Sequence, residues 1–197
     1  ELLEEDPLDF SLMQENLRTI EQSVMRIDRI VLDLMDTVSI EQGRLALSLM
    51  PSDLGTLLHS VEKDFSSHPS SGNNQLVLTI QPDLPEISAD PERLIQVVTN
   101  LISNAERHTR NGIITISLSG GPRWQTICVS DTGSGMSEEM RKNALKGYVS
   151  ADKDYWRHGI GLYVCHQIIT AHGGKIWIES EEGKGTRVFF SLPEEES

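Results

Sequence analysis

The sequence predicts an α+β protein, in which a mixed β-sheet carries three helices on one face and follows a long N-terminal helix. Two observations support this fold class. Apolar residues recur at spacings of three and four over about the first 40 residues, which is typical of a long helix. After that, helical and strand-like segments interleave without the regular parallel alternation of a Rossmann fold, and hydrophobic residues make up 38% of the 197 residues.

The charge, the hydropathy and the cysteines exclude several classes of function. The formal net charge of −13 argues against nonspecific nucleic-acid binding, which needs cations to displace the phosphate counterions. The sequence contains no run of about 18 apolar residues and no signal-peptide pattern. Cys128 and Cys165 lack paired spacing and are expected to be buried thiols of a reducing compartment. We therefore expect a cytoplasmic domain, which could reach a membrane only through a region upstream of Glu1.

The first helix is expected to run from Pro7 to about Ile40. Asp6 is a good N-cap, and Pro7 suits the first helical position. The apolar positions form a heptad seam: Phe10, Met13, Leu17, Ile20, Val24, Ile27, Val31, Leu34 and Val38. No other segment supplies a matching antiparallel helix, so the seam requires a missing upstream segment or a second copy of the chain. The alternative is a single helix packed on its own domain.

The remaining elements are predicted from local patterns. Ser52 is expected to cap a helix whose apolar face consists of Leu54, Leu57, Leu58, Val61 and Phe65. Asp90 and Pro91 start a second helix, and a third runs from Gly159 to about Ala171. A Gly-Gly-Pro turn joins the second and third of the expected strands, which are 76–80, 113–118, 126–130, 175–180 and 187–192. The polar loop 137–158 contains one helical turn and is the natural lid.

The second of these helices carries polar side chains on an otherwise apolar pattern. Asn100 and Asn104 are four residues apart, so both carboxamides stand on one side of the helix. Arg107 and His108 follow on the next turn. Amide oxygens can bind a hard cation, amide nitrogens can bind phosphate oxygens, and a guanidinium favours negative charge. The alternative is an amphipathic helix with ordinary polar residues.

Three glycine motifs follow this helix: Asp131-Thr-Gly-Ser-Gly-Met, His158-Gly-Ile-Gly-Leu and Gly183-Lys-Gly-Thr. Asp131 ends a strand, so its carboxylate can project into a pocket at the edge of the sheet. Gly133 and Gly135 allow a tight turn and the close approach of a ligand. Gly159 and Gly161 stand where a helix begins, and the free amides of a helix N-terminus bind phosphate. Taken one at a time, such motifs are also compatible with plain surface turns.

In this order and spacing, the motifs resemble the ATP-binding domain of sensor histidine kinases, in the GHKL group that includes gyrase, mismatch-repair ATPases and heat-shock chaperones. Residues 98–109 resemble the N box of that family, and the three glycine motifs resemble its G1, G2 and G3 boxes. The resemblance covers roughly residues 54–192 and implies the Bergerat α/β sandwich fold. It also implies part of a dimerisation and phosphotransfer hairpin over 1–50, mainly its second helix, and a catalytic domain over 51–197.

The resemblance implies a site for ATP and Mg²⁺. Asp131 would accept the amino group of adenine, and Asn104, assisted by Asn100, would hold Mg²⁺ between the phosphates. The residues that would meet phosphate oxygens or the lid are Arg107, His108 and Arg157. The glycine motifs would contribute the further nucleotide-binding residues Gly133, Gly135, Gly159, Gly161, Leu162 and Thr186.

The implied activity is that of a histidine protein kinase in a two-component system. The chain would transfer the γ-phosphate of ATP to a histidine, for relay to a response regulator, and would form a homodimer through its N-terminal helix. The acceptor motif of the family, a histidine followed by Glu and Arg, is absent from the sequence and is expected before Glu1. Asn100 stands where gyrase-like relatives carry a glutamate base, which favours transfer over hydrolysis.

Departures from the family pattern leave two alternatives open. His158 occupies a usual glycine position of the G2 box, and the lid lacks the phenylalanine that the family often carries there. One alternative is a serine kinase of the anti-sigma type, against which the long heptad helix counts. The other is a nucleotide-sensing dimerisation module without catalytic activity, which the absent acceptor and the altered G2 box support.

Overall fold

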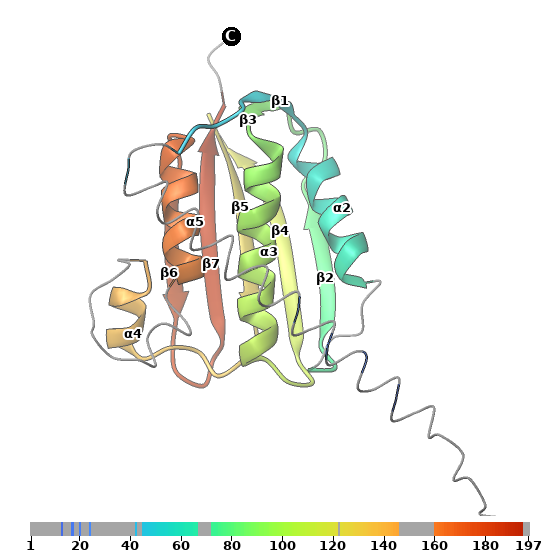
Figure 1. Ribbon diagram of the computed structural model, residues 1–197, viewed down its shortest axis with the longest axis vertical. Coiled ribbons are helices and arrows are strands. Elements are labelled where there is room, and N and C mark those ends of the chain that lie inside the picture. Colours follow the sequence, from blue (N-terminus) through green and yellow to red (C-terminus); the bar gives the residue numbers. More distant parts are fainter. Residues whose placement is uncertain are drawn as a thin grey trace, which may run out of the picture.

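The structure is a computed structural model that describes residues 13, 17, 20, 24, 42, 45–66, 72–121, 123–145 and 160–194. Its elements form two layers, a five-stranded β-sheet and the helices α2, α3 and α5 on one face of that sheet (Figure 1). The predicted α+β class with three helices on one face is confirmed. The elements in chain order are β1 (Met50–Ser52), α2 (Leu54–Ser66), β2 (Gln75–Ile80), β3 (Ile87–Ala89), α3 (Pro91–His108), β4 (Ile113–Gly121), β5 (Trp124–Asp131), α4 (Glu138–Asn143), α5 (Ile160–Ala171), β6 (Lys175–Ser180) and β7 (Thr186–Pro193).

The main sheet is mixed, as predicted. Its strand order is β2-β4-β5-β7-β6, with β2 parallel to β4 and all other neighbours antiparallel. A second, two-stranded sheet pairs β1 with β3, so that Met50 lies opposite Ala89. This small sheet could not be predicted from the sequence, because strands of three residues are too short to show an alternating pattern.

The core lies between the main sheet and the three helices. The predicted apolar stripe of α3 is buried, with exposed fractions of 0–2% for Leu94, Val97, Val98, Leu101 and Ile102. Strand β4 faces this stripe with the alternating buried residues Ile114, Ile116 and Leu118. α5 packs beside α3, and the Sγ atom of Cys165 lies 3.8 Å from the carbonyl oxygen of Val97. This packing fixes α3 along the middle of the sheet. It thereby places the polar residues at the C-terminal end of α3 beside one edge of the sheet.

The predicted cap of α2 is wrong by one residue. Ser52 belongs to β1, and its hydroxyl donates to the carbonyl oxygen of Met50 at 2.9 Å. Asp53 caps the helix instead, because its Oδ1 accepts the N–H groups of Gly55 at 2.8 Å and Thr56 at 3.2 Å. The residue directly before the first helical position is the one whose side chain can reach these free N–H groups.

The Gly-Gly-Pro turn between β4 and β5 is shorter than predicted. Gly120 and Gly121 continue β4 and pair with Gln125 and Trp124 of β5. The two glycines remain in the strand because antiparallel pairing gives each of them a partner in register. The chain reverses at Arg123, whose φ of 70° lies in the left-handed region.

The predicted start of α3 is confirmed, and its cap also joins other segments. Asp90 accepts the N–H of Arg93 at 3.1 Å through Oδ1 and the N–H of Ser48 at 2.9 Å through Oδ2. The N–H of Asp90 donates to Nε2 of His172 at 3.0 Å, and Nδ1 of His172 donates to the carbonyl oxygen of Ile168 at 2.8 Å. The buried Asp90 therefore connects the start of α3, the end of α5 and the segment before β1.

Asp90→Ala is expected to lower the free energy of unfolding by about 2–3 kcal/mol, because it removes an N-cap and a second hydrogen bond to Ser48. Urea unfolding followed by circular dichroism measures this loss. Glu92→Ala, an exposed position in the same turn, is the control and should cost less than about 0.5 kcal/mol. Equal losses in the two variants would show that the contacts of Asp90 contribute nothing.

Four residues of the predicted heptad seam lie within the described part of the chain. Met13, Leu17, Ile20 and Val24 are helical, and between 43% and 58% of their surface is exposed. The other seam positions lie outside the described residues. Dimerisation through this helix therefore stays a prediction, as do the domain limits 1–50 and 51–197. Within the described ranges, no helix combines the length and the apolar character that crossing a membrane requires.

Candidate functional site

Residues from three of the predicted motifs meet at one edge of the sheet, the lower edge in Figure 1. α3 ends there at His108 and β5 ends there at Asp131, with the turn between β6 and β7 beside them. Asp131 lies opposite Thr186, the first residue of β7. α5 begins at the same edge with Ile160, because it runs antiparallel to α3 (Figure 1).

Asp131 is a half-buried carboxylate at the end of β5. Its Oδ1 accepts the N–H of Gly133 at 2.8 Å. Burial raises the pKa of Asp131 above its ordinary value, while the N–H groups of Gly133 and Thr186 and the charge of His108 act in the opposite direction. A carboxylate has about four acceptor positions. Asp131 can therefore still accept a hydrogen bond from a ligand's amino group while it binds the N–H of Gly133.

Three glycines of the G1 and G3 motifs lie very close to other parts of the protein backbone. A Cβ atom at each of them would overlap a carbonyl oxygen, in the pairs Gly133–His108, Gly135–Glu181 and Gly185–Asp131. Gly135 and Gly185 also have positive φ angles of 67° and 82°. From the sequence, Gly133 and Gly135 are expected to allow a tight turn and the approach of a ligand. The neighbouring backbone is by itself sufficient to require glycine at both positions.

Hydrogen bonds tie the G1 loop to α3 and to the G3 turn. The N–H of Ser134 donates to the carbonyl oxygen of His108 at 3.2 Å, and the N–H of Gly183 donates to the carbonyl oxygen of Ser134 at 2.7 Å. Lys184 forms an ion pair of 2.7 Å with Glu181 inside the turn, and because both side chains are exposed, this pair stabilises the fold little. The G3 turn therefore does more than connect two strands, because it also holds the G1 loop.

Thr109 is a buried residue of the site that the sequence analysis does not name as a candidate. It follows the last residue of α3, is 1% exposed, and has a hydroxyl that finds no hydrogen-bond partner among the described residues. The hydroxyl lies near Asp131 and favours its ionised form without reaching a full hydrogen bond. An orphaned buried hydroxyl beside a half-buried carboxylate fits a polar ligand at this edge. In the sequence, Thr109 is the last residue of the N box and directly follows His108, and this position could have indicated that it belongs to the site.

The polar residues of α3 differ in exposure. Asn100 is buried, with 5% of its surface exposed, and Asn104 is half-buried. Arg107 and His108 are exposed at the end of the helix. Because Asn104 lies one turn before His108 and Asn100 one turn further back, Asn104 is the asparagine nearer the site edge.

The first turn of α5 contains two of the predicted nucleotide-binding residues. Gly161 is half-buried, and the side chain of Leu162 is 4% exposed and belongs to the core. Leu162 could therefore contribute to a site only through its backbone N–H, which is one of the free donors of a helix N-terminus. The predicted residues Arg157 and Gly159, and the altered position His158, lie outside the described residues.

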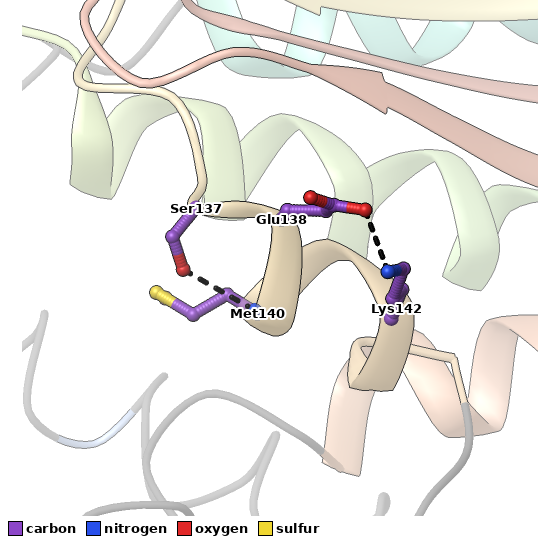
Figure 2. Close-up of polar contacts among 4 residues, drawn as sticks. All are labelled: Ser137, Glu138, Met140 and Lys142. Atoms are coloured by element: carbon purple, nitrogen blue, oxygen red, sulfur yellow. Dashed lines mark hydrogen bonds and ion pairs between the residues drawn. The ribbon is translucent and has the colours of Figure 1, made fainter.

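The segment after the G1 loop forms the short helix α4, which is the helical turn predicted in the lid. Ser137 caps it by accepting the N–H of Met140 at 3.3 Å, and Lys142 pairs with Glu138 at 2.6 Å (Figure 2). Both charged side chains are exposed, so the ion pair contributes less to the helix than the cap does. Met140 is 52% exposed beside them.

Residues 89–196 match the family described as histidine kinase-, DNA gyrase B-, and HSP90-like ATPase. This range contains α3 and all three glycine motifs. The chain belongs to this ATPase family. The edge formed by the end of α3, the G1 loop and the G3 turn is accordingly the candidate nucleotide site of this chain.

Several curated relatives of this chain are sensory kinases. Adaptive-response sensory kinase SasA of Synechococcus elongatus is 34% identical over 171 residues, which cover 85% of this chain and 44% of SasA. The chain spans about half the length of the curated relatives it matches.

Full-length ShkA in complex with AMPPNP is 25% identical, with a TM-score of 0.76 over 91% of this chain and 38% of ShkA. ThkA in complex with the response regulator TrrA shares the fold at 24% identity, with a TM-score of 0.69 over 96% of this chain and 53% of ThkA. The chain therefore carries an ATP-binding catalytic domain of the histidine kinase type.

Proposed function

We propose that this chain is the catalytic part of a sensor histidine kinase, which binds Mg-ATP and transfers the γ-phosphate to a histidine outside the chain. Asp131 is the observation that carries the proposal. Its half-buried carboxylate is bordered by the orphaned hydroxyl of Thr109 and by the N–H of Thr186. The remaining acceptor positions of the Asp131 carboxylate are complementary to the exocyclic amino group of adenine. Gly133 and Gly135 keep the loop beside the carboxylate in place.

Asn104, with Asn100 behind it, would bind the Mg²⁺ that accompanies the nucleotide. In the described ranges, no three side chains of the His, Cys, Asp or Glu type form a group that could hold a metal ion. Mg²⁺ is ordinarily held by one or two protein groups together with substrate phosphates and water. An amide oxygen of Asn104 fits that pattern, and the bound metal would neutralise phosphate charge.

The phosphate groups would be bound by the first turn of α5 and by the end of α3. The free N–H groups of a helix N-terminus favour negative charge, and α3 ends with two basic side chains. The proposed phosphate-binding residues are Gly161, Leu162, Arg107 and His108, together with Arg157 and Gly159 on the sequence resemblance alone.

Transfer to a protein side chain is favoured over hydrolysis of ATP. Asn100 is an amide, so it cannot take a proton from water as a glutamate base would. The described histidines of this chain are also poor acceptors. His108 belongs to the proposed site, and both ring nitrogens of His172 are engaged in hydrogen bonds. His59 and His166 are not followed by the Glu and Arg of the acceptor motif.

The proposal includes the setting of a two-component system. The structure of ThkA that shares this fold was determined in complex with a response regulator, and we propose a partner of the same kind for this chain. A homodimer formed by the heptad seam would bring the catalytic domain to its acceptor histidine. Cys128 and Cys165 are both free thiols, which supports a cytoplasmic location.

Mg-ATP is expected to raise the melting temperature of the chain. At about 100 times its Kd, a ligand selective for the native state stabilises it by about 2.7 kcal/mol. For a domain of this size, that corresponds to roughly 5–10 °C in a thermal melt. Mg-GTP is the control and should shift the melt less, because guanine carries a carbonyl where adenine carries the amino group. A melt that millimolar Mg-ATP leaves unchanged would contradict the assignment.

Labelled ATP is expected to phosphorylate a separate acceptor-bearing helical hairpin in the presence of this chain, but not the chain itself. Attack on the γ-phosphate requires an imidazole nitrogen in line at near-contact distance. Acid-labile, base-stable label on the hairpin supports the histidine kinase. An acid-stable label on an anti-sigma antagonist would favour the serine kinase instead. Binding without any transfer would favour the nucleotide-sensing module. Acid-labile label on the chain itself would show that an acceptor lies within it.

A further inference from the structure

Ser180, the last residue of β6, makes three hydrogen bonds through one hydroxyl. Its Oγ accepts the N–H of Met136 at 2.8 Å and donates to the carbonyl oxygen of Gly185 at 2.9 Å. The hydroxyl of Thr186 lies 3.1 Å from the same atom. Because the single proton of Ser180 goes to Gly185, Thr186 is the donor in this third contact. The hydroxyl thereby uses its full capacity of one donated and two accepted bonds.

These bonds join the two loops that form the candidate nucleotide site. Met136 follows Gly135 of the G1 motif and directly precedes Ser137, the cap of α4. Gly185 and Thr186 belong to the G3 motif and begin β7. Ser180 therefore links the start of the lid segment to the G3 turn, which borders the carboxylate of Asp131.

The same turn acts directly on Asp131. A Cβ atom at Gly185 would overlap the carbonyl oxygen of Asp131, and the N–H of Thr186 favours the ionised carboxylate. A backbone bond from Gly183 to Ser134 provides a second tie between the turn and the G1 loop. A side-chain substitution cannot remove that backbone bond, so Ser180 is the point at which the link can be weakened selectively.

We propose that Ser180 is a positioning residue for nucleotide binding, which holds the G1 loop and the G3 turn together beside Asp131. The inference rests on the proposed binding of ATP. Ser180 does not need to touch the nucleotide. It fixes the backbone of Met136 in advance, so that less conformational freedom is lost when the nucleotide binds. Removing the hydroxyl leaves the N–H of Met136 without its partner and lets the base of the lid segment move.

Ser180→Ala is expected to weaken Mg-ATP binding roughly tenfold, because the hydrogen bonds that hold the loop in its binding conformation are lost. Ser180→Thr keeps the hydroxyl and should retain most of the affinity. Ser191→Ala, a buried serine of β7 that faces Thr126 and Lys175 in the register, is the matched control. Calorimetric titration with Mg-ATP gives the Kd of each variant. Hydrogen exchange at the Met136 amide should be fast in Ser180→Ala and slow in the wild type and in Ser180→Thr.

The measurements separate this role from a purely structural one. A lower melting temperature of Ser180→Ala with an unchanged Kd for Mg-ATP would overturn the inference. Slow hydrogen exchange at the Met136 amide in Ser180→Ala would overturn it as well. If the wild type fails to bind Mg-ATP, the proposed function is overturned and the inference with it. Wild-type binding together with unchanged affinity in Ser180→Ala overturns the inference alone. Should the alanine variant not fold, Ser180→Cys keeps nearly the same volume, weakens the same bonds and carries the same expectations.

Discussion

Replacing Asp131 with asparagine is expected to abolish most of the nucleotide-induced stabilisation of this domain. The substitution removes the charge and replaces one of the two acceptor oxygens with an NH₂ donor. If the remaining oxygen keeps the hydrogen bond from the N–H of Gly133, the NH₂ group faces the amino group of adenine. The loss of a hydrogen bond to a charged group costs about 2–3 kcal/mol, or roughly 30- to 160-fold in Kd. At a concentration of Mg-ATP that equals about 100 times the wild-type Kd, the stabilisation should fall from about 2.7 to about 0.3–0.9 kcal/mol. Thermal melts with and without Mg-ATP measure both values.

Asp83→Asn is the matched control for this substitution. Asp83 is exposed, lies in the loop after β2, and has a φ of 58°, which asparagine tolerates well. It should bind Mg-ATP as the wild type does. Equal affinities of the Asp131 and Asp83 variants would show that the carboxylate of Asp131 does not contact the nucleotide.

Asp131→Asn is also expected to stabilise the ligand-free protein at neutral pH. Burial raises the pKa of Asp131, so the folded state binds its proton more tightly than the unfolded state does. The protonated Asp131 therefore contributes its full stabilisation at pH values below the pKa of the unfolded state. This stabilisation is lost as the pH rises through the pKa of the folded state. Asparagine avoids the cost of the buried charge at pH 7, and its advantage should shrink as the pH falls through the raised pKa of Asp131 and level off below the unfolded pKa of about 4. An advantage of Asp131→Asn that is constant with pH would contradict this account.

Gly185→Ala is expected to cost more than about 4 kcal/mol of stability, which is enough to impair folding. The new Cβ would overlap the carbonyl oxygen of Asp131, and the φ of 82° is itself unfavourable for alanine. Since the obstacle is backbone, a rotation of side chains cannot relieve it. Expression as soluble protein and chemical unfolding measure the loss.

Gly183→Ala separates the two parts of this cost. Gly183 lies in the same turn with a φ of 78°, but a Cβ atom there would meet nothing within 4 Å. Only the backbone preference of about 1–2 kcal/mol should be lost. Similar losses at Gly183 and Gly185 would mean that the contact with Asp131 is unimportant and that positive φ alone explains the glycines.

Patterns within short stretches of sequence predicted most of the elements that carry the site. The apolar stripe of α3 recurs at helical spacing, and Asp90 and Pro91 mark its start, so the helix and its buried face could be predicted. The order of the N box and the three glycine motifs predicted the ATPase family, which the match over residues 89–196 confirms. These signals are local because helix caps and amphipathic periods depend on residues only a few positions apart.

The contacts inside the site depended on the tertiary structure. No spacing in the sequence indicates that Gly133 meets the carbonyl oxygen of His108, that Thr109 is buried beside Asp131, or that Ser180 holds Met136. Each of these contacts joins segments that become neighbours only when β5, β7 and α3 pack at one edge of the sheet. Strand register and backbone approach are set by that packing, whereas a glycine or serine in a turn has the same local propensity with or without it.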